Sequence, residues 1–159
     1  MTASFLVAAV LLLIANAFFV AVEFALLASR VARLEPMVES GDDERAAIAL
    51  DAVRDLQPQL AGAQLGITMA SLVLGYVAEP SVAHLIERGI EQFWHPSAGV
   101  IHAISLTVAL SIVVVVHMVL GEMVPKNLAI AAPEATARLL APLHGAYVTL
   151  LRPLVWFLT

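Results

Sequence analysis

The sequence predicts an all-α membrane protein with three transmembrane helices and a bent juxtamembrane helix, its N-terminus outside and its C-terminus in the cytoplasm. Hydrophobic residues make up 61% of the chain and charged residues only 13%, against about 25% charged in a typical soluble domain. Apolar residues gather in three segments of membrane-spanning length, and basic residues gather between the first two. The chain has no cysteine, which excludes disulfides and thiolate metal sites, and it has no basic patch for nucleic acid.

The predicted spans are residues 4–29, 60–78 and 98–121. Ala15-Asn16-Ala17 resembles a signal-peptidase site, so a cleaved signal peptide is an alternative for the first. The absence of a basic leader and the length of the apolar run favour an uncleaved span. Orientation follows from the basic residues, since only Arg88 lies between the second and third spans. The segment between the first two spans holds four basic residues, Arg30, Arg33, Arg45 and Arg54.

Shorter helices are expected outside the spans. The Gly41-Asp42-Asp43 sequence indicates a break followed by the N-cap of a cytoplasmic helix. Pro80 is expected to start a separate interfacial helix along the outer leaflet, followed by Trp94 and His95. Residues 133–159 are interpreted as a bent juxtamembrane helix, although residues 139–159 are apolar enough for a fourth span. The chain ends within an apolar run, which suggests a membrane domain, 1–159, of a longer protein.

The segment from Gly121 to Lys126 is the most informative for function. Glu122 follows a span-length apolar run, and a carboxylate near hydrocarbon is a functional-site hypothesis by default. Pro125 has no N–H to bond the Gly121 carbonyl, so the helix is expected to break and leave that carbonyl free. Carboxylate and carbonyl oxygens suit a hard cation. The alternative is a plain ion pair between Glu122 and Lys126, four residues apart.

Further polar residues lie in the inner half of the other spans. Glu23 is placed at a depth similar to that of Gln64 and Thr68, so these three are candidate cation-binding residues with Gly121 and Glu122. Each has a purely structural alternative. Thr68 is more often a backbone-bonded helix residue, and Glu23 can pair with Arg30. Gln64, like Asn16 of the first span, can join helices by hydrogen bonds.

Small residues recur every four positions in the second span, at Gly62, Gly66 and Ala70. Such a stripe permits close helix approach, either within the chain or at a dimer seam. The sequence leaves both alternatives open.

Together these segments resemble the membrane domain of the CorC/CNNM (hemolysin C-like) family. The resemblance rests on Phe18 to Ala25 with Ser29-Arg30, on Ala63 to Thr68, and on the Gly-Glu-x-x-Pro-Lys element at 121–126. It implies a homodimeric three-span domain with cytoplasmic CBS domains beyond residue 159. It also implies efflux of Mg²⁺, driven by Na⁺. Val20 and Val22 stand where many relatives carry serines, and Thr68 where they often carry asparagine.

Two classes of function follow. In a transporter, Glu122 would be the main anionic ligand, with Gly121 and Thr68 as neutral oxygens and Glu23 serving the same cation or Na⁺. Pro125 would shape the helix, and Lys126 would orient or neutralise Glu122. The carried ion could instead be another cation, such as a polyamine. In the second class the domain is a membrane anchor or sensor for a cytoplasmic region. No nucleophile–base pair is visible, so we do not expect an enzyme.

Overall fold

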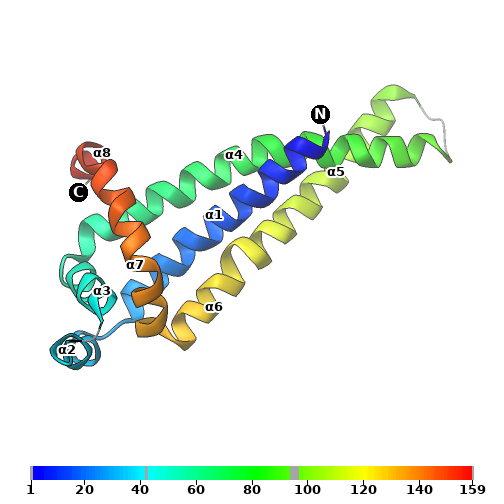
Figure 1. Ribbon diagram of the computed structural model, residues 1–159. Coiled ribbons are helices and arrows are strands. Elements are labelled where there is room, and N and C mark those ends of the chain that lie inside the picture. Colours follow the sequence, from blue (N-terminus) through cyan, green and yellow to red (C-terminus); the bar gives the residue numbers. More distant parts are fainter. Residues whose placement is uncertain (1, 42, 94–96, 159) are drawn as a thin grey trace.

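The computed structural model describes residues 2–41, 43–93 and 97–158, and within these ranges the regular structure is entirely helical (Figure 1). Trp94, His95 and Thr159 lie outside the described residues. The elements in chain order are α1 (Thr2–Ala28), α2 (Val31–Glu39), α3 (Glu44–Arg54), α4 (Leu56–Glu91), α5 (Ala98–Val116), the π-helical η1 (His117–Met123), α6 (Val124–Ala131), α7 (Pro133–Leu150) and α8 (Arg152–Leu158).

Three helical segments of the described chain are long and apolar enough to cross a membrane: Ser4–Ala28, Leu56–Glu91 and Ala98–Ala131. The prediction of three spans is thereby confirmed. The third span is continuous through α5, η1 and α6. In Figure 1, α1 lies between α4 and this third span, and α1 packs against both. The shorter helices α2, α3, α7 and α8 gather at one end of the bundle.

The separate interfacial helix expected from Pro80 is wrong. The α4 helix continues through Pro80 to Glu91. A proline removes one backbone hydrogen bond, but neighbouring side chains and local adjustments let long membrane helices tolerate it. Here Ser81, directly after the proline, donates its hydroxyl to the Val77 carbonyl oxygen at 2.8 Å.

The helix break expected at Pro125 is also wrong, and a wider turn stands in its place. The chain forms a π-helix over His117–Met123, and the Val124 N–H bonds the Val119 carbonyl five residues back. Proline clashes with the carbonyl four residues before it in a regular α-helix. An extra residue in the preceding turn changes that register, so Pro125 can be buried near the start of α6 without ending the helix.

The short helices form a layer across one end of the spans. Gly41, with φ of 76°, ends the α2 segment in a left-handed conformation that glycine adopts at no steric cost. Asp43 caps α3 and accepts hydrogen bonds from the Arg45 and Ala46 N–H groups, which confirms the predicted cap. Asp43 also pairs with Arg138 of α7. Its burial would raise the carboxyl pKa, but the Arg138 hydrogen bond and charge, with the two capping N–H groups, hold the pKa below its usual value.

The small-residue stripe of α4 packs within the chain, so the dimer-seam alternative is wrong. Gly62, Gly66 and Ala70 are all buried. A Cβ on Gly66 would lie 2.6 Å from atoms of the Phe19 ring on α1, and one on Gly62 would lie 2.6 Å from a Val148 methyl on α7. The absence of side chains therefore lets α1 and α7 approach the α4 backbone closely.

Candidate functional site

The π-helical turn places two ionisable side chains of the third span on one face. His117 and Glu122 are five residues apart, a spacing that a π-helix brings into line, whereas an α-helix favours spacings of three and four. His117 Nε2 lies 3.9 Å from Glu122 Oε1, too far for a hydrogen bond. The Glu122 side chain is 51% exposed, so it is not sequestered in the protein core.

Asn16 of α1 is hydrogen-bonded to this turn. Its side chain is fully buried, at 0% exposure. Its Nδ2 donates a buried 2.9 Å hydrogen bond to the Gly121 carbonyl oxygen, the acceptor that Pro125 cannot serve. Gly121 is required here, because a Cβ would lie 2.7 Å from His117 Cδ2 and 3.2 Å from Asn16 Nδ2.

Two buried polar atoms in this group lack a partner. Within the part of the chain that the structure describes, neither Asn16 Oδ1 nor His117 Nε2 has a hydrogen-bond partner. Buried polar atoms are usually satisfied, and exceptions require an explanation. The turn therefore offers the Gly121 carbonyl, the Asn16 amide oxygen, the His117 nitrogen and the Glu122 carboxylate within one short region.

A second polar group joins α1 to α4. Gln64 Nε2 donates to Glu23 Oε1 at 3.3 Å, and the described residues give Glu23 no ion pair with Arg30. The Thr68 hydroxyl donates to the Gln64 carbonyl oxygen at 2.8 Å. Thr68 thus makes the intrahelical bond of the structural alternative, while remaining exposed beside Gln64. Glu23 lies seven residues after Asn16, or about 10 Å along the helix at ~1.5 Å per residue.

Lys126 does not contact Glu122 in this structure. Its ammonium group lies 4.4 Å from the centre of the Phe24 ring on α1, in a cation–π arrangement. No ion pair between Glu122 and Lys126 occurs among the described residues. In the Gly-Glu-x-x-Pro-Lys element, Glu122 and Lys126 therefore face different partners, and Lys126 does not neutralise the Glu122 carboxylate.

The structure thus divides the candidate residues between two groups. Gly121 and Glu122 join Asn16 and His117 on one side, and Glu23, Gln64 and Thr68 form the other. No cluster of three or more His, Asp or Glu side chains able to hold a metal occurs among the described residues. The sequence predicts that Asn16 can join helices by a hydrogen bond, and the structure adds the partner, Gly121, which no spacing rule could name.

His144 of α7 forms a separate buried contact at the short-helix end. Its Nε2 lies 3.0 Å from the Gln59 carbonyl oxygen. Because a carbonyl only accepts, Nε2 carries the proton and the neutral ring leaves Nδ1 without hydrogen. Burial lowers the pKa of His144, and the Gln59 carbonyl offsets part of this effect. Protonation would place a buried N–H at Nδ1, which has no partner among the described residues.

Comparison with known proteins identifies the family. The model of the cyclin M transmembrane N-terminal domain (CNNM) matches residues 7–159. An uncharacterized protein of Mycobacterium tuberculosis, Rv1841c, is 46% identical over 94% of this chain and 41% of its own length. The UPF0053 protein YhdT of Bacillus subtilis is 36% identical over 90% of this chain and 31% of its own length. A further Bacillus subtilis protein, YrkA, is 34% identical over 99% of this chain and 36% of its own length.

The chain spans less than half the length of these curated relatives. The match to the family model covers nearly all of the sequence, including the three spans and the layer of short helices. The chain therefore belongs to the CNNM family and corresponds to its transmembrane domain.

Proposed function

We propose that this domain carries a divalent cation, Mg²⁺, out of the cell across the plasma or inner membrane. The observation that carries the proposal is the π-helical turn at His117–Met123. Single π-helical turns occur frequently at functional sites. This one carries a carbonyl oxygen at Gly121 and a carboxylate on the next residue, Glu122, and those are the oxygen ligands that hard cations prefer.

In this proposal Glu122 supplies the negative charge of the binding site. The Gly121 carbonyl oxygen has two lone pairs, so it can accept from Asn16 and still offer one to a cation. The unpartnered Asn16 Oδ1 is a further neutral oxygen within the same group. Mg²⁺ usually retains several waters, which would fill the remaining positions of its octahedral shell.

The second polar group would form an earlier cation-binding position on the same path; its residues are Glu23, Gln64 and Thr68. The basic residues between the first two spans favour a cytoplasmic position for the short-helix end. Glu23 is closer to that end than Asn16, so a cation entering from the cytoplasm would meet Glu23 first. Na⁺ would bind at this earlier position when it drives export. Lys126, held over Phe24, would move towards Glu122 after the cation leaves.

We further expect the full-length protein to be a homodimer with cytoplasmic CBS domains following this domain. The third span buries only a narrow face within the chain, and large apolar side chains cover the rest. That surface suits lipid or a second copy of the chain.

Flux measurements in proteoliposomes test the proposal. Purified protein should export Mg²⁺, and Glu122→Gln should nearly abolish both flux and Mg²⁺ binding by calorimetry while folding persists. Glu91→Gln is the matched control, because Glu91 is an exposed acid at the far end of α4. Unchanged Mg²⁺ affinity in Glu122→Gln would remove Glu122 from the site. Transport of a diamine alone would replace Mg²⁺ as the cargo, and no flux of either would favour a membrane anchor.

A further inference from the structure

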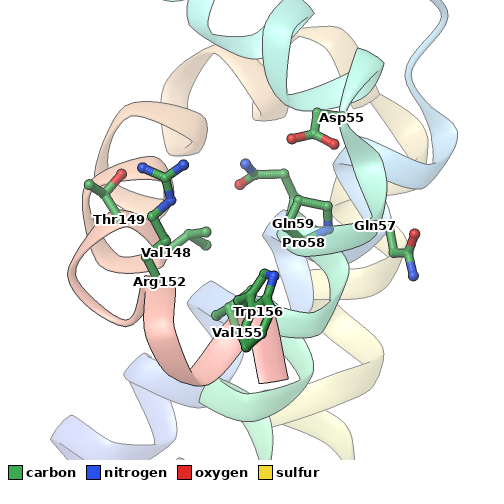
Figure 2. Close-up of a pocket in the computed structure, with 9 residues that line it drawn as sticks. All are labelled: Asp55, Gln57, Pro58, Gln59, Val148, Thr149, Arg152, Val155 and Trp156. Atoms are coloured by element: carbon green, nitrogen blue, oxygen red, sulfur yellow. The ribbon is translucent and has the colours of Figure 1, made fainter. Parts of the chain in front are cut away.

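A polar hollow of about 510 Å³ opens at the short-helix end, where α4 begins and α7 passes into α8 (Figure 2). Its walls come from two segments that are distant in sequence, residues 55–59 and residues 148–156. The first segment contributes Asp55 and Gln59, and the second contributes Thr149 and Arg152. The hollow is separate from the two polar groups of the candidate cation site, which lie between the spans.

Two opposite charges face this hollow without neutralising each other. Figure 2 shows the Arg152 guanidinium and the Gln59 amide pointing towards the same open space, with the Asp55 carboxylate beside them. Neither Arg152 nor Asp55 makes an ion pair within the part of the chain that the structure describes. Asp55 stands at the N-cap position of α4, yet its side chain makes no capping hydrogen bond. The Gln59 Oε1 atom is buried and unpartnered among the described residues.

One lining residue of the hollow, Trp156, is apolar and 79% exposed. Two residues that adjoin lining residues in sequence, Leu150 and Phe157, are 78% and 80% exposed. Large apolar side chains exposed together mark a membrane or protein contact. Tryptophan is enriched at the membrane–water interface, where one end of a side chain is apolar and the other is wet. A polar hollow with an exposed tryptophan in its wall fits an amphipathic ligand, with its head in the hollow and its chains along Trp156.

The charge pattern selects among lipid head groups. A phosphate is drawn to a guanidinium and can accept hydrogen bonds from it. The Asp55 carboxylate would repel a purely anionic head group, but it can accept hydrogen bonds from a primary ammonium group. A quaternary ammonium has no N–H to donate and is instead recognised by aromatic cages. One cation and one unpaired anion therefore match a head group that carries both charges and ends in a primary amine.

We propose that this hollow binds the phosphoethanolamine head group of a phospholipid. The phosphate lies against Arg152 and the Gln59 amide, and the ammonium lies against Asp55. The acyl chains leave the hollow along Trp156. The lipid thereby links the start of α4 to the α7–α8 bend and anchors the short-helix layer to the membrane surface.

Native mass spectrometry of the detergent-purified protein tests this proposal. Equal amounts of phosphatidylethanolamine, phosphatidylcholine and phosphatidylglycerol are added, and the retained lipid is counted. We expect preferential retention of phosphatidylethanolamine and a loss of roughly tenfold in its affinity in Arg152→Gln, since a hydrogen bond to a charged group is removed. Asp55→Asn should abolish the preference over phosphatidylglycerol. The control is Arg88→Gln, which removes an exposed arginine near the opposite end of α4 and should change nothing.

Specific outcomes would overturn the proposal. Equal retention of the three lipids by the unmodified protein would do so, as would phosphatidylethanolamine binding that Arg152→Gln leaves unchanged. Soluble phosphoethanolamine and inorganic phosphate are tested alongside. If either binds the hollow as tightly as the diacyl lipid, the ligand is a soluble phosphate compound and the lipid assignment is wrong. Both substituted side chains are exposed, so the variants should fold, which gel filtration verifies.

Discussion

Gly66 and Gly75 lie on the same helix, yet alanine at the two positions should have different effects on stability. A Cβ at Gly66 would lie 2.6 Å from three atoms of the Phe19 ring, whereas a Cβ at Gly75 would meet nothing within 4 Å. Alanine is favoured over glycine in a helix by about 1 kcal/mol. This gain is common to both substitutions, so their difference isolates the contact between α4 and Phe19.

The magnitude follows from how tightly Phe19 is held. Its ring centre lies 5.1 Å from that of Phe18 and 4.8 Å from that of Tyr147. A ring packed on several sides cannot turn away as a terminal methyl can. Overpacking of this kind typically costs about 1–3 kcal/mol. Because each kcal/mol shifts the midpoint by about 2–4 °C in a chain of this size, Gly66→Ala should unfold about 2–12 °C below Gly75→Ala.

Thermal unfolding in one detergent, with both variants at equal concentration, measures this difference. Phe19→Leu provides the internal control, because a smaller side chain removes the ring atoms that the new methyl group would meet. In the Phe19→Leu background, Gly66→Ala and Gly75→Ala should have the same unfolding midpoint. Equal midpoints for the two alanine variants in the unmodified background would refute the close approach of α1 and α4 at Gly66.

Three further predictions concern single residues. The folded-state pKa of His144 lies below its unfolded value, so its stabilising contribution is complete above about pH 6.5 and is lost as the pH falls towards the folded pKa. The unfolding midpoint should therefore fall more steeply between pH 7.5 and 5 in the unmodified protein than in His144→Gln; parallel curves would contradict this. Pro125→Ala restores an N–H that can compete for the Gly121 carbonyl. Mg²⁺ flux should therefore fall by a larger fraction than the free energy of unfolding does. Normal flux in this variant would show that the turn has no role in transport. The chain has no cysteine, so Glu23→Cys gives a single labelling site. A membrane-impermeant thiol reagent should reach it from the cytoplasmic side, and Mg²⁺ should slow the reaction. Absence of labelling would exclude an aqueous cavity there, and labelling that Mg²⁺ leaves unchanged would remove Glu23 from the binding site.

The spans could be predicted because their signal is local. An apolar run of sufficient length must form a helix in hydrocarbon, where every backbone group needs an internal partner. The same principle explains the error at Pro80. In water a proline with polar residues after it often begins a new helix, but α4 continues through Pro80, because a proline removes only one of the backbone hydrogen bonds of a helix. The Asp43 cap was predictable for the same local reason, since the capping oxygen and its N–H donors lie within three residues.

The arrangement of the candidate site depends instead on contacts between distant residues. The bond from Asn16 to Gly121 joins residues 105 positions apart. Lys126 is four residues from Glu122, a spacing that favours an ion pair on a helix, but it lies over Phe24 of another helix. Spacing along one helix ranks the possible partners on that helix. It contains no information about an aromatic ring or an amide that tertiary packing brings closer.

The hydrogen bond between Asn16 and Gly121 reduces two free-energy costs that arise in the membrane, one from Pro125 and one from Asn16. Pro125 leaves the Gly121 carbonyl without its usual donor, and a buried unpaired carbonyl costs about 1–3 kcal/mol. An amide buried in an apolar span is also costly unless it is hydrogen-bonded. The bond between Asn16 and Gly121 removes part of both costs. It leaves Asn16 Oδ1 and His117 Nε2 unpartnered among the described residues, next to an acid that its own lysine does not neutralise. A purely structural pairing would gain nothing from these unused groups, whereas the cation site that we propose here requires ligands that are not already committed to the protein.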